Sequence, residues 1–152
     1  MTNSPPQLAA ALADHPFFSS MPSVVVNELG THAYRHDYPA GSVVFQEGGA
    51  ADQFMVIRQG LIKLDIEVPG RGRVDIETLG ADTVLGWSWL FSPYRWHLGA
   101  VALERTKVLA FDASALRGLM AADSLIGYEL MRRVAAVMLD RLQATRRRLG
   151  EH

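Results

Sequence analysis

Glycine, proline and aspartate divide the middle of this sequence into short apolar segments at regular intervals. From Thr31 to Asp112, stretches rich in Val, Ile, Leu and aromatic residues alternate with turn residues at a spacing of roughly 8–12 positions, which is typical of an antiparallel sandwich or barrel. We expect strands at 32–38, 42–46, 53–59, 61–68, 73–79, 83–87, 98–103 and 106–111. Gly60 and Gly80 stand at two of the predicted turns, where we expect a positive φ.

Helical patterns flank this β region on both sides. Short helices are expected up to about Asp14 and over 22–30, and two further helices over about 113–122 and from Ser124 to about 149. The whole chain, residues 1–152, is the size of one domain. It has no cysteine, which excludes disulfides and thiolate metal sites, and no apolar run long enough to span a bilayer. The N-terminus lacks the features of a secretion signal, so we expect a cytoplasmic protein.

The last predicted helix carries two apolar lines. One follows a heptad-like spacing and is our candidate for a homodimer interface: Tyr128, Met131, Ala135, Met138, Leu142 and Leu149. The other consists of Leu130, Val134 and Val137. Either one line packs on the β region while the other meets a partner helix, or both are buried within a monomer. Between positions 132 and 148 the sequence has six arginines and only one acidic residue. These arginines form either a solvated face or a surface for phosphates or acidic proteins.

Catalytic and metal-binding patterns are missing. None of the five histidines has the spacing of a metal site, and His32 and His36 have no acids nearby at ligand spacing. Ser88 lacks the second glycine of a nucleophile elbow. We therefore expect no enzyme and no bound metal, and a metal-dependent cupin-type enzyme is a remote alternative.

One aromatic segment interrupts the strand pattern. Residues 86–97 hold all three tryptophans of the chain together with an arginine and a histidine, and they are typical of a short helical turn and a loop. Unpaired N–H groups at such a turn suit an anion, Gly86 would permit a close approach to the main chain, and Arg95 or His97 could supply a positive charge. Alternatively, the aromatic rings simply plug the end of a small barrel.

Glycines recur in three stretches of the predicted β region: Pro39-Ala40-Gly41, residues 45–60 (FQEGGAADQFMVIRQG) and residues 79–86 (LGADTVLG). This glycine pattern resembles the cyclic-nucleotide-binding domains of bacterial catabolite and anaerobic regulators and of kinase regulatory subunits. The resemblance implies a mainly β fold, a double-stranded β-helix or jelly roll, with short N-terminal helices and two C-terminal helices. It also implies a cyclic nucleotide, cAMP or cGMP, as regulatory ligand and pairing of two chains through the last helix.

The phosphate-binding cassette of that family departs from its usual form in this chain. By spacing, Gly86 matches the cassette glycine, but Trp87 replaces the glutamate that binds ribose and His97 replaces the arginine that binds phosphate. Leu98 stands at the Ser/Thr position. We therefore expect weak cAMP binding or another ligand, and a ligand-free module that holds protein partners is the alternative. The candidate ligand-binding residues are Gly86, Trp87, Ser88, Trp89, Arg95, Trp96, His97, Leu98 and Gly99.

The transcription factors of this family continue into a helix-turn-helix domain. The sequence stops at His152, where that domain would begin, so we expect no sequence-specific DNA binding. A membrane partner is not expected either.

Overall fold

The computed structural model describes residues 5–150 of the chain. Its internal contacts group into two units that divide between Arg117 and Gly118, and each unit is described by itself. The interpretation of residues 1–152 as one domain, whose ends lie outside the described residues, stays a prediction.

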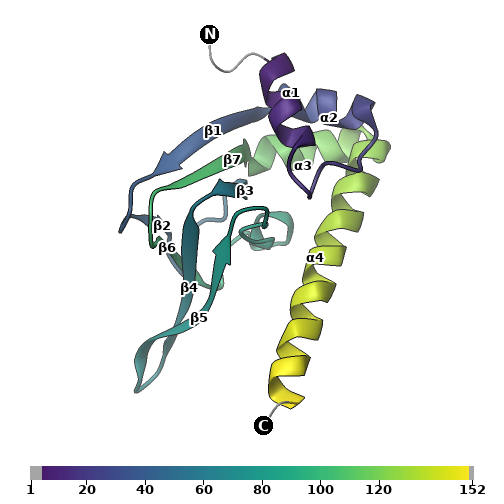
Figure 1. The fold of residues 1–152 in the computed structure, drawn as a ribbon. Helices are drawn as coiled ribbons and strands as arrows, with labels where there is room; N and C mark the ends of the chain where they lie inside the picture. The colour runs from purple at the N-terminus through teal and green to yellow at the C-terminus, as the bar shows by residue number, and fades with distance from the viewer. Residues whose placement is uncertain (1–4, 151–152) are drawn as a thin grey trace. The chain divides into compact units, whose positions relative to one another are not determined.

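The first unit is an antiparallel β-sandwich of the jelly-roll type, as the sequence predicts (Figure 1). One sheet has the order β1-β7-β3 and the other the order β2-β6-β4-β5. The strands are β1 (Ala33–Tyr38), β2 (Val43–Phe45), β3 (Gln53–Gln59), β4 (Leu61–Val68), β5 (Gly72–Gly80), β6 (Gly99–Ala102) and β7 (Thr106–Asp112). Seven of the eight expected strands are present within a residue or two of their predicted ends.

The expected strand over 83–87 is wrong. This segment runs beside β3 but pairs with it at a single bridge, between Val56 and Val84. Its backbone makes two hydrogen bonds to β3, Ile57 N–H to the Thr83 carbonyl at 2.8 Å and Leu85 N–H to the Met55 carbonyl at 3.1 Å. The chain then leaves the sheet for the 3₁₀ turn η1 (Ser88–Leu90), so the pairing ends before a ladder can form.

Helices α1 (Pro5–Ala13) and α2 (Ser23–Gly30) precede the sandwich and pack on each other. α2 forms despite its three consecutive valines, because Val25, Val26 and Leu29 are buried and tertiary packing outweighs their low helix propensity. Helix α3 (Ala113–Ala122) follows β7 directly and begins in the first unit. The Asp112 carboxylate accepts the Ala115 N–H at 2.9 Å and so caps the first turn of α3.

The two glycines expected at positive φ behave differently. Gly60, between β3 and β4, has φ +117, which confirms the prediction there. Gly80 is the last residue of β5 and does not have a positive φ, so the expectation for Gly80 is wrong. The positive φ of that turn lies two residues later, at Asp82 with φ 70, because aspartate tolerates the left-handed region better than most residues.

A buried histidine connects the loop after α1 to β3. His15 Nδ1 accepts the Phe17 N–H at 3.1 Å, which leaves Nε2 to donate to the Ile57 carbonyl at 3.0 Å. Both ring nitrogens are thus used by a neutral imidazole. Burial lowers the pKa of His15 below its ordinary value, and the hydrogen bond to Ile57 opposes that shift only in part.

The second unit contains α4 (Ser124–Gly150), whose start is capped by the Asp123 carboxylate. The two apolar lines that the sequence indicates on this helix differ in burial. Leu130 and Val134 are buried, whereas all six residues of the candidate dimer line are exposed: Tyr128, Met131, Ala135, Met138, Leu142 and Leu149. No helix among residues 5–150 is long and apolar enough to cross a membrane.

Candidate functional site

The segment from Gly86 to Gly99 is held in place by backbone pairing with residues 48–51. Gly48 N–H donates to the Trp96 carbonyl at 2.7 Å, Trp96 N–H donates to the Gly49 carbonyl at 2.9 Å, and Ala51 N–H donates to the Tyr94 carbonyl at 2.8 Å. The loop after η1 is therefore tied by three hydrogen bonds to residues 48–51, far away in sequence.

Trp89 belongs to the hydrophobic core. It is fully buried and its ring stacks on Phe54 with centroids 4.7 Å apart. Phe54 in turn contacts Phe18 and Phe111, so Trp89 completes an aromatic cluster of the first unit. This position supports the barrel-plug interpretation for Trp89.

Trp96 occupies the space that Gly86 leaves open. The Trp96 side chain is 5% exposed and stacks in parallel on Phe45, with ring centroids 3.8 Å apart and an interplanar angle of 7°. A Cβ atom added at Gly86 would lie 2.9 Å from Cζ3 of the Trp96 ring. The close approach that Gly86 permits is thus made by an indole ring of the same chain, a role that the sequence pattern did not indicate.

The polar residues of the segment lie at the surface. Arg95 is exposed and its Nη1 donates to the Gly48 carbonyl at 3.2 Å, and His97 is also exposed. Trp87, Ser88 and Leu98 are half-buried, as is Gly86, while Gly99 is buried. The structure does not bring Arg95 and His97 together in a buried anion site. A ligand-binding role for these nine residues stays a prediction.

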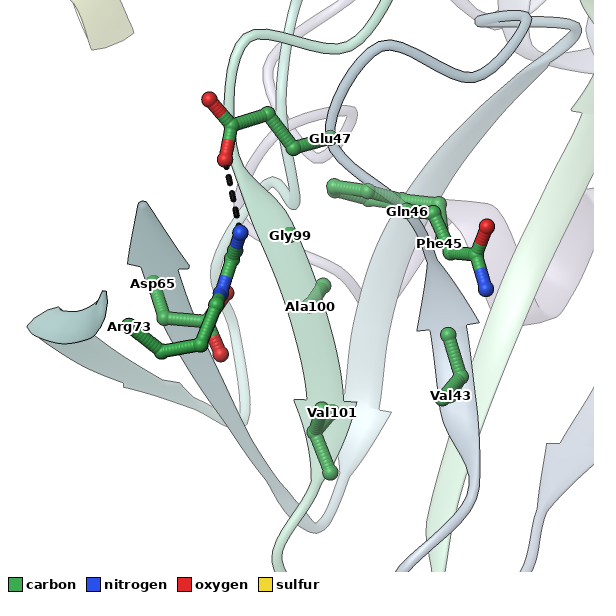
Figure 2. Close-up of a pocket in the computed structure, with 9 residues that line it drawn as sticks. All are labelled: Val43, Phe45, Gln46, Glu47, Asp65, Arg73, Gly99, Ala100 and Val101. Atoms are coloured by element: carbon green, nitrogen blue, oxygen red, sulfur yellow. Dashed lines mark hydrogen bonds and ion pairs between the residues drawn. The ribbon is translucent and has the colours of Figure 1, made fainter. Parts of the chain in front are cut away.

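Gly99 faces a hollow of about 350 Å³ beside β2, β4, β5 and β6 (Figure 2). In the register of β4 and β6, Ala100 pairs with the buried Leu64, whereas Gly99 pairs with Asp65. The lining residues of the hollow are Val43, Phe45, Gln46, Glu47, Asp65, Arg73, Gly99, Ala100 and Val101.

An ionic cluster crosses this hollow, as Figure 2 shows in part. Arg73 Nη1 donates to Glu47 Oε1 at 2.9 Å, and Nη2 forms an ion pair with the buried Asp65. The Glu67 N–H also donates to Glu47 Oε1, and this hydrogen bond, supported by Arg73, holds the pKa of Glu47 below its ordinary value. Arg73, the one arginine that lines the hollow, is thus already paired with two carboxylates.

Gly99 makes room for this cluster. A Cβ atom there would lie 2.5 Å from Asp65 Oδ1 and 2.8 Å from Arg73 Nη2. Sequence reasoning included Gly99 but missed Glu47, Asp65 and Arg73. The strand pattern over 61–68 and 73–79 gives no sign that Arg73 pairs with Asp65 of the neighbouring strand.

A second hollow, of about 290 Å³, lies where the loop meets the start of α3. There the Arg117 guanidinium stacks on the Tyr94 ring at 3.8 Å from its centroid and donates to the Trp89 carbonyl at 2.6 Å. Arg95 and Arg117 line the hollow together with Asp52 and Asp112, so opposite charges balance. Arg117 therefore supports the loop, a role that nothing in the sequence indicated. Among residues 5–150 no group of three or more His, Asp or Glu side chains could hold a metal ion.

Comparison with known proteins supplies a family. The profile of the family described as "Cyclic nucleotide-binding domain" matches residues 35–123. A comparison with curated protein sequences found no match.

Three solved structures illustrate the likeness in fold. A protein from Geobacter metallireducens GS-15, described as a cyclic nucleotide-binding protein, has a TM-score of 0.77 and 26% identity over 91% of this chain and 98% of that chain. A cyclic nucleotide-binding domain from Methylobacillus flagellatus KT has a TM-score of 0.81 and 18% identity over 97% of this chain and 84% of that one. The catabolite activator protein of Thermus thermophilus has a TM-score of 0.70 and 24% identity over 89% of this chain and 62% of its own.

Proposed function

Since this chain belongs to the cyclic nucleotide-binding domain family, we propose that it is a cytoplasmic regulatory sensor domain, not an enzyme, that binds cAMP weakly or binds a different small molecule. The carrying observation is the Trp96 ring, which fills the space where a Cβ atom of residue 86 would lie and so blocks that side of the Gly86 backbone. Neither polar contact of the usual cassette compensates for this loss of space. The Arg95 side chain donates to the Gly48 carbonyl, and position 87 holds a tryptophan in place of an acid.

Two losses of binding energy support weak cAMP binding. An arginine pairs with a phosphate through two charge-assisted hydrogen bonds, and the exposed His97 at the matching position cannot reproduce that geometry. The half-buried Trp87 adds apolar volume where the family places a hydrogen-bond acceptor for ribose. A ligand with fewer charges and a flatter, more apolar body would lose less in such a site.

Isothermal titration with cAMP and cGMP tests the proposal. We expect no binding, or a dissociation constant well above the low micromolar range, for the wild-type chain. Trp96→Ala should bind cAMP more tightly than the wild type, because it opens the space at Gly86. Phe91→Ala, which removes an exposed ring of the same segment, is the matched control and should change nothing. Low-micromolar cAMP binding by the wild type would refute the proposal.

A ligand-free protein-interaction module is the second candidate function. It is favoured by the burial of Trp89 and Trp96 in the first unit and by the exposed apolar line on α4. We propose that this line, from Tyr128 to Leu149, pairs two copies of the chain into a homodimer. Screening a panel of nucleotides by thermal shift separates the two functions, because a sensor is stabilised by its ligand and a ligand-free module by none.

A further inference from the structure

A third hollow, of about 250 Å³, lies on the other sheet of the sandwich. It is formed where β1, β7 and β3 lie next to one another, with β7 in the middle. Its lining residues come from all three strands: Arg35, His36, Asp37, Arg58, Lys107 and Val108. None of them belongs to the Gly86–Gly99 segment or to the ionic cluster around Arg73.

A register shift in β3 places Arg58 at this hollow. Ile57 pairs with Val108 and Gln59 pairs with Lys107, so Arg58 is the extra residue between two consecutive pairs. Such an irregularity costs ladder pairing and turns a side chain to a new direction, and it is frequent beside binding sites. On the other edge of β7, Lys107 pairs with Asp37 of β1.

The charges of the hollow are unbalanced. Its one carboxylate, Asp37, is already held by Arg105, whose Nε and Nη2 donate to the two oxygens at 3.0 and 2.5 Å. This contact lowers the pKa of Asp37, which therefore stays ionised and paired. Within residues 5–150 the side chains of Arg58 and Lys107 make no hydrogen bond or ion pair.

We propose that this hollow binds a phosphate or pyrophosphate group. Arg58 and Lys107 line the same hollow from adjacent strands, and a polyvalent anion bound there could pair with both charges at once. The volume of about 250 Å³ is below the range of about 300–1,000 Å³ that is usual for pockets of drug-sized ligands, which suits a small anion better than a whole nucleotide. The Arg58 guanidinium offers a fork of donors to phosphate oxygens, and Lys107 a point charge.

Calorimetric titration with sodium pyrophosphate at constant, low ionic strength tests this site. We expect the wild-type chain to bind, Arg58→Ala and Lys107→Ala each to bind about tenfold more weakly, and added salt to weaken binding further. Arg71→Ala removes the same charge at the turn between β4 and β5 and should bind like the wild type. Arg58, Lys107 and Arg71 are all exposed, so the three variants should melt like the wild type without ligand.

Two results would overturn the proposal: no measurable heat with pyrophosphate in the wild type, or equal weakening by Arg71→Ala and Arg58→Ala, which would mean diffuse charge attraction. A parallel cAMP titration keeps the two sites apart. Arg58→Ala should leave the response to cyclic nucleotides as it is in the wild type, because no residue of the hollow lies in the aromatic segment.

Discussion

Gly60 and Gly80 form a natural pair for testing the backbone geometry of the sandwich by substitution with valine. The two glycines flank the β4–β5 hairpin, where Gly80 pairs with Leu61, the residue after Gly60, yet their surroundings differ. Gly60 has φ +117, and a Cβ atom added there would lie 2.6 Å from the Thr106 Cα and 2.7 Å from the Arg105 carbonyl oxygen. At Gly80 the nearest atom would be 3.8 Å away, an ordinary contact, and φ is not positive.

The expected cost follows from these two differences. A non-glycine residue at such a φ costs about 1–3 kcal/mol, and forcing a side chain against backbone atoms that cannot rotate away adds about 1–3 kcal/mol. Gly60→Val should therefore lower the free energy of unfolding by about 2–6 kcal/mol. Gly80→Val meets neither penalty and replaces a glycine at a strand end by a good strand former, so it should stay within about 1 kcal/mol of the wild type.

Urea unfolding followed by circular dichroism measures both values directly. For a chain of this size, 1 kcal/mol corresponds to about 2–4 °C in melting temperature, so Gly60→Val should melt at least about 4 °C below the wild type. The reasoning fails if Gly60→Val melts with the wild type, or if Gly80→Val loses as much stability as Gly60→Val. Unchanged m-values in both variants would show that only the native state is affected.

Three further predictions concern other parts of the chain. Because burial lowers the pKa of His15, the unfolded chain takes up a proton below pH about 6.5 while the folded chain does not. The free energy of unfolding should therefore fall as the pH drops from about 6.5. Urea titrations at several pH values measure this dependence, and His15→Gln should flatten it. Gly99→Ala should lower the free energy of unfolding by about 1–3 kcal/mol in the same assay, because its Cβ would meet the Asp65 carboxylate. An unchanged stability would show that the ionic cluster can rearrange without cost and would contradict this prediction. Met138→Glu with Leu142→Glu should give a folded monomer in light scattering, and a wild-type mass of only 16.7 kDa at about 100 µM would contradict the homodimer.

Local sequence signals were sufficient for most of the fold. The β4 segment ends where the Pro69-Gly70 turn begins, and α3 starts at the Asp112 cap, because turn and cap residues act on their immediate neighbours. A turn does follow Gly80, as predicted, but the residue with a positive φ in that turn is Asp82 and not Gly80. Glycine is the residue that most often adopts a positive φ, so the sequence pointed to Gly80. The three-dimensional path of the chain determines that Asp82 adopts it in this turn.

The candidate site could not be predicted in the same way, because its geometry depends on contacts between distant residues. Trp96 packs on Phe45, which lies 51 positions earlier, and Arg73 of β5 pairs with Glu47, which lies 26 positions earlier in the loop after β2. Spacing alone identifies Gly86 as a place of close approach, but it cannot say whether a ligand or an indole makes that approach. The same glycine is compatible with both.

The stacked Trp96 sets an energetic scale for any ligand that needs the space at Gly86. Such a ligand would have to displace the indole, which gives up about 1.5–3 kcal/mol of apolar burial and about 1 kcal/mol of stacking on Phe45. With about 1.4 kcal/mol for each factor of ten, the indole alone would weaken binding by roughly two to three orders of magnitude. A molecule that binds this domain tightly must therefore either avoid the Gly86 backbone or regain that energy from contacts with Trp96 in its displaced position. An aromatic group placed there can regain it by stacking on the indole, whereas a phosphate group cannot.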